Sequence, residues 1–268
     1  MGQGGLADSI KVDCTVFRSG GMAHVSQRTG FNGSALVCVL SRLTGTEVRE
    51  SGQATADRLS QWFGWTDAIS LSAALNGGLA PAPAGARASS SAEEGEYARV
   101  RTALKNAIAE DGLSTTDKEG RRLRASTPGD TAATTAAFKP YRQRYLAQQQ
   151  AMESSIAPLR SRLRAALAAR SPAMARLAAV DVVMEQVLGA RERSLLTAAS
   201  AGLARHFERL RQAAQASIDP GDTTPPGEWL DLFCKDMQDL LLAELDFRMQ
   251  PIEGLLEALR MRPPDCHE

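Results

Sequence analysis

The chain has 268 residues, and its 31 lysines and arginines balance its 31 aspartates and glutamates, so the formal net charge is zero. This balance argues against a polycation that coats nucleic acid along its whole length. No stretch approaches the roughly 18 apolar residues of a membrane-spanning helix, and four scattered cysteines without a CxxC spacing predict neither a zinc site nor a disulfide framework.

Glycine divides the chain into two unlike parts. Residues 1–138 contain 17 of the 22 glycines, and residues 139–268 contain five. Glycine in a helix interior costs about 1 kcal/mol relative to alanine. We therefore expect short helices in the first part and long, uninterrupted helices in the second.

Residues 1–30 predict a disordered tail, because they are irregular and carry two Gly-Gly pairs. They lack the basic stretch and apolar run of a secretory signal. Met22 follows the second pair, and we expect it to be the biological start, with residues 1–21 as an extension.

Residues 31–75 predict a small N-terminal helical unit. A short helix is expected at 34–43, where Asn32 or Ser34 can accept hydrogen bonds from the free N–H groups of its first turn. A second helix is expected at 54–75, with Gly64 weakening its middle.

The second helix contains the densest aromatic site of the chain, Trp62, Phe63 and Trp65. The two tryptophans are three residues apart, which predicts adjacent positions on one helix face. They form either the core of the small unit or an anchor for a partner, since tryptophan is enriched in interface hot spots. These three residues are our candidate partner-binding site.

Residues 76–92 are rich in Gly, Pro, Ala and Ser and predict a flexible linker. Residues 93–137 predict one helix, at 93–110, followed by a polar loop. The buried stripe of that helix is expected at Tyr97, Val100, Leu104 and Ile108, which are spaced by three and four residues.

Three long amphipathic helices are predicted at 139–170, 173–217 and 228–260, followed by a tail at 261–268. Ser171-Pro172 is typical of a helix start, so the second helix should fold back antiparallel. Pro158 and Pro251 should bend their helices, and Gly189 and Gly202 are candidate breaks. The fold class is therefore all-α: an antiparallel bundle of long, partly kinked helices at 138–260 beside the N-terminal unit.

The apolar residues of each long helix recur at steps of three and four, and in the middle helix this pattern resembles a coiled-coil seam. The first stripe is Tyr141, Tyr145, Met152, Ile156, Leu159, Leu163 and Leu167. The second is Leu177, Val180, Met184, Val187 or Leu188, Leu195, Leu203, Phe207, Leu210 and Ala214. The third is Leu230, Phe233, Met237, Leu240, Leu241, Phe247, Ile252, Leu255 and Leu259.

Charge is segregated between these helices. Residues 139–176 carry eight basic groups and one acid, a net of +7, whereas residues 219–268 carry twelve acids and four basic groups, a net of −8. Either the first and last long helices are neighbours joined by ion pairs, or the arginine-rich face is free to bind phosphates. The candidate anion-binding residues are Arg142, Arg144, Arg160, Arg162 and Arg164.

No motif for catalysis, cofactor binding or metal binding is found, so we predict no catalytic, cofactor-binding or metal-binding residue. The three histidines, His24, His206 and His267, are far apart and none has metal-ligand spacing. His206 should be a partly exposed helix residue paired with Glu185, Glu208 or an acid of a neighbouring helix.

Two pairs of carboxylates are candidates for acid–base catalysis or for ion pairing. Asp181 and Glu185 are four residues apart on one predicted helix and either pair with arginines or serve in catalysis. Glu244 and Asp246 point to different sides of the last helix, so we expect at least one of them to be exposed.

Several segments resemble a proteobacterial domain-of-unknown-function family, numbered 3348. They are RTGFNGSALVCVLSRLTG, RLSQWFGWTDAISLSAALNG, SPAMARLAAVDVVMEQVLGARERSLL, HFERLR and DMQDLLLAELDFRMQPIEGLLEALR. The resemblance spans about Arg28 to Arg260 and implies no assigned activity. The gene neighbourhood typical of the family implies a cytoplasmic helper of a membrane assembly that contains OmpA/MotB-like envelope proteins.

We interpret the chain as a non-enzymatic, cytoplasmic interaction or scaffold protein that self-associates or binds a protein partner, without cofactor or membrane span. The alternative is nucleic-acid or phosphate binding through the arginine-rich helix at 139–176. A third hypothesis is an enzyme that uses Asp181 or Glu185 in a polar pocket without arginine partners.

Overall fold

The computed structural model describes residues 34–45, 55–76, 90–115, 131–216 and 228–261. In these ranges the chain is all-α, as predicted, and the secondary structure is helical without a strand. The predicted tail at 1–30 with its proposed start at Met22, most of the linker, most of the polar loop and residues 262–268 lie outside the described residues.

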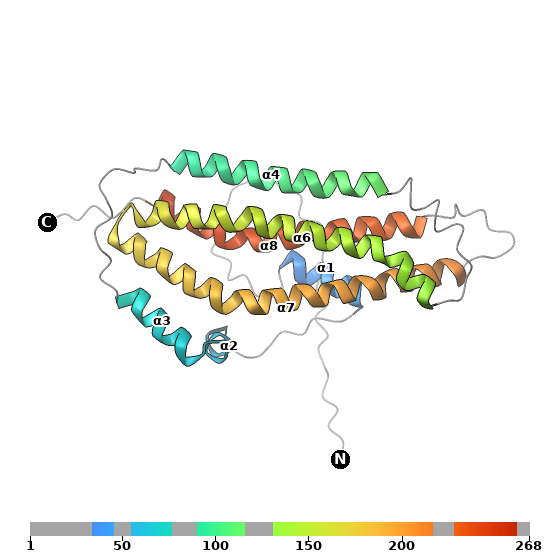
Figure 1. The fold of residues 1–268 in the computed structure, drawn as a ribbon, viewed down its shortest axis with the longest axis horizontal. Coiled ribbons are helices and arrows are strands. Elements are labelled where there is room, and N and C mark those ends of the chain that lie inside the picture. The colour runs from blue at the N-terminus through green and yellow to red at the C-terminus, as the bar shows by residue number, and fades with distance from the viewer. Residues whose placement is uncertain (1–33, 46–54, 77–89, 116–130, 217–227, 262–268) are drawn as a thin grey trace, which may run out of the picture.

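Four long helices form the bundle: α4 (Ser90–Thr115), α6 (Thr131–Ala168), α7 (Pro172–Ala216) and α8 (Glu228–Arg260). They alternate in direction along the chain, so the bundle is antiparallel (Figure 1). The prediction of a three-helix core was incomplete, because α4 also packs on α6 and α8 and buries Leu104 and Ile108. The stripe predicted for this helix thus identifies the face that joins the bundle.

The apolar stripe predicted for α6 is buried along its whole length, from Tyr141 to Leu167. Pro140 and Pro158 lie inside this helix, and Pro251 lies inside α8, without ending either. The predicted start of α7 is also confirmed: the Met174 N–H donates to Ser171 Oγ at 3.2 Å. The short turn between α6 and α7 makes them an antiparallel pair.

Helix α7 runs for 45 residues and continues through both candidate breaks. Gly202 faces α1, where a Cβ would make an ordinary van der Waals contact with the Thr44 side chain at 3.4 Å. The stripe predicted for this helix was wrong at Leu177 and Leu195, which are exposed. Its buried residues at the start of the helix are the smaller Ala175 and Ala178, which a pattern of large apolar residues overlooks.

Aromatic rings fill one region of the core, where α6, α7 and α8 meet. Phe207 lies at the centre, with its ring centroid 5.0 Å from that of Phe233 and 5.3 Å from that of Trp229. Phe138 and Tyr141 of α6 lie within 5.6 Å of the same ring. Such edge-on and tilted contacts add to the free energy of burial and fix the relative register of the three helices.

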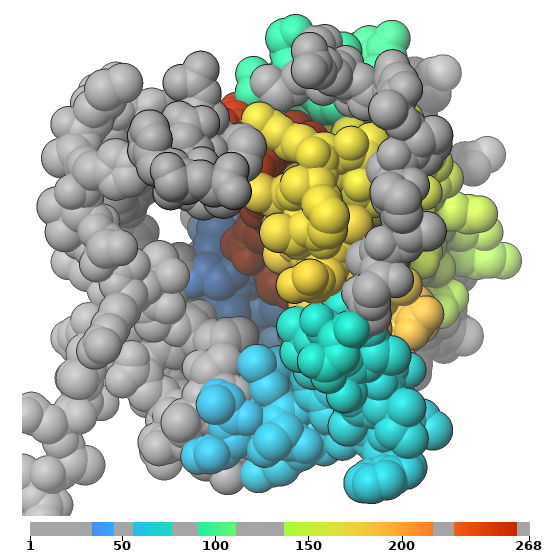
Figure 2. Space-filling view, turned by 90° about the vertical axis from the view of Figure 1, so that its left-hand side faces the viewer, coloured from blue at the N-terminus to red at the C-terminus, as the bar shows by residue number. Residues whose placement is uncertain are grey.

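Three short helices complete the described structure: α1 (Ala35–Thr44), α2 (Thr55–Trp62) and α3 (Trp65–Asn76). The first packs on α7 and α8 and buries Leu36 and Leu43. The third packs along α7. Residues 31–75 were predicted as one small unit, and the structure places their helices individually against the bundle, with α2 and α3 at one edge (Figures 1 and 2).

None of the described helices is both long and apolar enough to cross a membrane.

Candidate functional site

The predicted partner-binding residues Trp62, Phe63 and Trp65 lie at the junction of two helices. We predicted that both tryptophans share one helix, and this was wrong, because α2 ends at Trp62 and α3 begins at Trp65. The Gly64 N–H donates to Asp67 Oδ2 at 2.9 Å. A carboxylate in the first turn that accepts from the preceding N–H marks a new helix start, so a second helix begins here.

The two tryptophans consequently have different environments. Trp62 is half-buried, and the Arg191 guanidinium of α7 lies 4.8 Å from its ring centroid. This cation–π contact attaches the end of α2 to the bundle. Trp65, in contrast, has 81% of its surface exposed. Phe63 is half-buried, so only Trp65 of the three predicted residues projects fully into solvent.

Two further large apolar residues of α3 are exposed, Ile69 at 54% and Leu75 at 53%. No residue of this helix is fully buried, and its only charged residue is Asp67. We refer to Trp65, Ile69 and Leu75 as the exposed α3 surface. Figure 2 shows α2 and α3 along the lower edge of this end of the molecule, below the residues that join α6 and α7.

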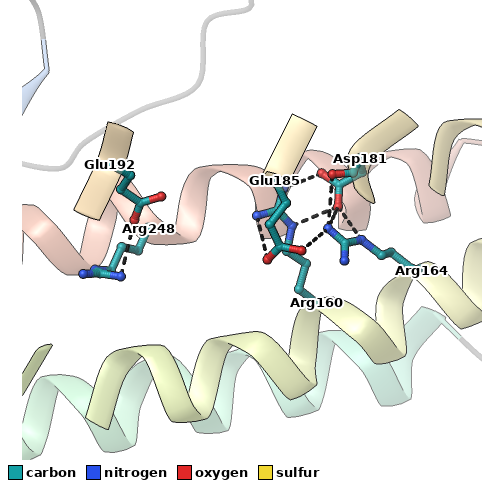
Figure 3. Close-up of polar contacts among 6 residues, drawn as sticks. All are labelled: Arg160, Arg164, Asp181, Glu185, Glu192 and Arg248. Carbon is teal, nitrogen blue, oxygen red and sulfur yellow. Dashed lines mark hydrogen bonds and ion pairs between the residues drawn. The ribbon is translucent and has the colours of Figure 1, made fainter. Parts of the chain in front are cut away.

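Two of the candidate anion-binding arginines, Arg160 and Arg164 of α6, bind carboxylates of α7 (Figure 3). Arg160 Nη2 lies 2.6 Å from Asp181 Oδ1, and Arg164 Nη2 lies 2.6 Å from Asp181 Oδ2. Arg164 also reaches Glu185 Oε2 at 2.7 Å. Both guanidiniums and Asp181 are largely buried, so these ion pairs join the two helices and leave little of either arginine for phosphate.

The same contacts decide the chemistry of Asp181. Burial raises the pKa of its carboxyl, but the hydrogen bonds and positive charges of Arg160 and then Arg164 outweigh burial and lower the pKa below its ordinary value. A carboxylate with a lowered pKa and two arginine partners is a poor proton acceptor. The arginine-free polar pocket that the enzyme hypothesis requires is not found around Asp181 and Glu185.

The other candidate arginines have three different environments. Arg162 points to α4, with Nη2 3.2 Å from Glu93 Oε1 and Nη1 3.8 Å from Glu96 Oε1. Arg144 is half-buried, whereas Arg142 is exposed. The structure therefore does not bring these five arginines together as one phosphate-binding face.

The predicted ion pairing between the first and last long helices was wrong in its partners. Helices α6 and α8 are neighbours, but Arg160 and Arg164 of α6 pair with α7, and Arg162 pairs with α4. The α8 acids pair elsewhere: Asp246 with Arg101 of α4 at 2.7 Å, and Asp236 with Arg42 of α1 at 3.1 Å. Net charge per segment cannot predict these partners, because pairing depends on which face each residue occupies.

A polar network that the sequence analysis missed lies inside the bundle. Glu244 of α8 is completely buried and accepts hydrogen bonds from Tyr145 Oη at 2.8 Å and Gln149 Nε2 at 3.0 Å, both from α6. Arg248 Nε donates to Glu244 Oε1 at 2.9 Å, and its Nη1 lies 3.3 Å from Glu192 Oε1 of α7. These five residues, the Glu244 network, connect three helices.

Protonation of the Glu244 network reflects its burial. Burial raises the pKa of Glu192, Arg248 lowers it, and Glu244 raises it again, with a net increase. Burial raises the pKa of Tyr145, and the negative charge of Glu244 and the hydrogen bond to it raise this pKa further. The Tyr145 hydroxyl therefore remains a donor. Two carboxylates share Arg248, and protonation of Glu192 relieves their repulsion. As predicted, Glu244 and Asp246 point to different sides, and Asp246 is partly exposed.

His206 was predicted to be partly exposed, and this was wrong, because only 5% of its surface is accessible. Its expected partner, an acid of a neighbouring helix, is found: Nε2 lies 2.7 Å from Asp236 Oδ2 of α8. Among the described residues, no group of three or more His, Cys, Asp or Glu side chains could hold a metal ion.

The chain belongs to the family described as Protein of unknown function (DUF3348), whose model matches residues 22–261. The family resemblance is thus confirmed. No curated protein and no solved structure matches the chain.

Proposed function

We propose that this chain is a non-enzymatic helical scaffold protein that binds a protein partner through the exposed α3 surface. The observation that carries the proposal is the 81% exposure of Trp65 at the start of α3, followed one turn later by the exposed Ile69 and near the end of the helix by the exposed Leu75. A tryptophan at such a position contributes nothing to the bundle core, and exposed groups of large apolar residues mark interaction sites. Tryptophan is also among the residues that contribute most to binding at protein interfaces.

The chemistry of this surface favours a protein partner. Asp67 is the only charged residue of α3, so the helix lacks the basic residues that bind phosphate. An apolar helix face of this kind fits the apolar face of a partner helix. In keeping with the family resemblance, we propose that the partner belongs to an OmpA/MotB-like envelope assembly and that binding takes place on its cytoplasmic side.

The nucleic-acid alternative has less support from the described residues. Arg160, Arg162 and Arg164 each lie within 3.2 Å of a carboxylate oxygen. A phosphate would have to displace the carboxylates of Asp181 and Glu93, and both of these side chains are largely buried. Of the five candidate arginines, Arg142 is the one that is exposed and without an ion pair in the described part of the chain.

The test is co-purification of the tagged full chain, expressed at its native level in the source cells. The double variant Trp65→Ala/Ile69→Ala should recover at least about tenfold less partner than the wild type, because it removes the apolar anchor. The exposed Arg142→Ala variant is the matched control and should recover the partner normally.

Three outcomes distinguish the hypotheses. Equal recovery of the partner by the double variant and the wild type contradicts the proposal. If a second copy of the chain is recovered with the wild type but not with the double variant, the exposed α3 surface is a binding site and the partner is the chain itself. Recovery of nucleic acid that disappears with nuclease, with salt and with Arg142→Ala would instead support the alternative.

A further inference from the structure

Helix α1 has only ten residues, and its helical state depends on the bundle. An isolated helix shorter than about 12–15 residues is marginal in water. In the structure α1 buries Leu36 and Leu43 against α7 and α8, and its end approaches the backbone of α7 at Gly202. The surface of α7 and α8 therefore acts as a binding site for this helix.

A polar cluster at the end of α1 holds it in place. We refer to Arg42, His206, Arg209 and Asp236 as the His206 cluster. Arg42 Nη2 of α1 lies 3.1 Å from Asp236 Oδ1 and 3.2 Å from Asp239 Oδ2, both on α8. Arg209 Nη2 of α7 donates to the Leu43 carbonyl oxygen at 3.2 Å. Each bond joins α1 to one of its two supports.

The hydrogen bonds of His206 determine its tautomer. Arg209 Nη2 lies 2.7 Å from His206 Nδ1, and a guanidinium can only donate, so Nδ1 accepts and carries no proton. Nε2 therefore carries the proton and donates to Asp236 Oδ2 at 2.7 Å. The cluster binds α1 with the imidazole in its neutral form.

A second proton on His206 is incompatible with this arrangement. It would place an N–H on Nδ1 directly against Arg209 Nη2, the nitrogen that also donates to the Leu43 carbonyl. Arg209 Nη2 would have to withdraw from Nδ1, which disturbs its bond to the Leu43 carbonyl oxygen.

The local charge supports this consequence. The charged groups that face His206 or its partners are Arg209 from α7, Asp236 and Asp239 from α8, and Arg42 from α1. Two cations and two anions balance, so a second proton on the buried His206 gives the cluster an excess positive charge. Histidine is the side chain whose charge ordinarily changes between about pH 5 and 8.

We propose that α1 is a pH-controlled docking helix, which leaves its site on α7 and α8 when His206 binds a second proton. Release exposes Leu36 and Leu43 of α1 and the surface of α7 and α8 that they cover. This inference does not depend on whether the exposed α3 surface binds a partner.

Hydrogen–deuterium exchange of the full chain tests the proposal. We expect peptides from α1, corrected for intrinsic exchange, to exchange about tenfold faster at pH 5.5 than at pH 7.5, the effect of losing one charged hydrogen bond. Peptides from α6 should be unchanged and report that the bundle remains folded. Equal corrected exchange of α1 at both pH values would overturn the proposal.

Two variants assign the response to His206. His206→Gln keeps a donor for Asp236 and an acceptor for Arg209 but cannot bind the proton, so its α1 exchange should not depend on pH. If the α6 peptides of His206→Gln exchange fast, the bundle of that variant is not folded, and Arg209→Gln is used in its place. In Arg209→Gln, the α1 peptides should exchange faster than in the wild type at both pH values, with little dependence on pH.

The exposed Arg205→Gln, on the same helix, is the matched control and should retain the full response. A full response in His206→Gln, or in Arg209→Gln, would contradict the assignment to His206.

Discussion

The Glu244 network and the exposed α3 surface use their side chains in opposite ways. In the first, a fully buried carboxylate accepts hydrogen bonds from two residues of α6 and from one residue of its own helix. In the second, a short helix turns a tryptophan, an isoleucine and a leucine towards solvent. Buried polar groups with complete partners stabilise and align a bundle, whereas exposed apolar groups do not stabilise the chain that carries them. The comparison separates residues that maintain the fold from residues available for binding.

The largest expected effect is from Glu244→Ala. The variant removes the charged partner that the largely buried Tyr145 and Arg248 share, and leaves Arg248 with Glu192 alone, so the free energy of unfolding should fall by about 3–5 kcal/mol. Urea denaturation monitored by circular dichroism measures the change. Glu257→Ala, an exposed carboxylate of the same helix, is the control and should change stability by less than about 0.5 kcal/mol. Similar losses in both variants would show that the network has no special role.

A smaller loss, about 2 kcal/mol, is expected for Asp181→Asn at neutral pH, because two largely buried arginines lose one of their two charged partners and keep only Glu185. The pKa of Asp181 is lowered in the folded state. Its stabilisation is therefore present above the ordinary aspartate pKa and is lost as the pH falls through the folded value. The difference between wild type and variant should shrink towards acid pH, and a constant difference would contradict the assignment.

Glu192→Gln should give a smaller effect of opposite sign. The pKa of Glu192 is raised, so its favourable contribution is present at low pH and is lost as the pH rises through the folded value. The glutamine keeps an acceptor for Arg248 without a charge. The variant should gain stability relative to the wild type as the pH rises from about 4 to 7, as thermal melts in matched buffers would measure. A loss that grows with pH would show that ionised Glu192 stabilises the fold.

The smallest effect on stability is expected at the exposed α3 surface. Trp65→Ala should change the free energy of unfolding by less than about 0.5 kcal/mol, because the side chain is 81% exposed. Trp62→Ala is the informative counterpart, since it removes the contact with Arg191 and should be more destabilising. If Trp65→Ala were the more destabilising of the two, Trp65 would serve the fold and not binding.

Periodicity predicted the long helices well because burial follows a face of constant spacing. The α6 stripe is buried throughout, and α8 occupies the predicted range, Glu228–Arg260. The start of α3 was missed because it depends on one hydrogen bond, from the Gly64 N–H to the Asp67 carboxylate. The low helix propensity of Gly64 predicts a weak point in a helix but not the start of a new one.

The polar clusters could not be predicted from the sequence. Glu244 and its α6 donors are about 100 residues apart, and nothing in either segment identifies the other. The signal that existed was a carboxylate within LLLAELDFR, a segment with too many apolar residues to lie at the surface. The same limit applies to His206, whose burial depends on Asp236 and on the docking of α1.

Photo-crosslinking in cells tests the central claim most directly. A photoreactive amino acid replaces Trp65 in one variant and the exposed Arg142 in a control, and the crosslinked proteins are identified by mass spectrometry. The account predicts that position 65 captures one protein partner that position 142 does not capture. Equal yields and the same proteins at both positions would show that the exposed α3 surface is not a binding site.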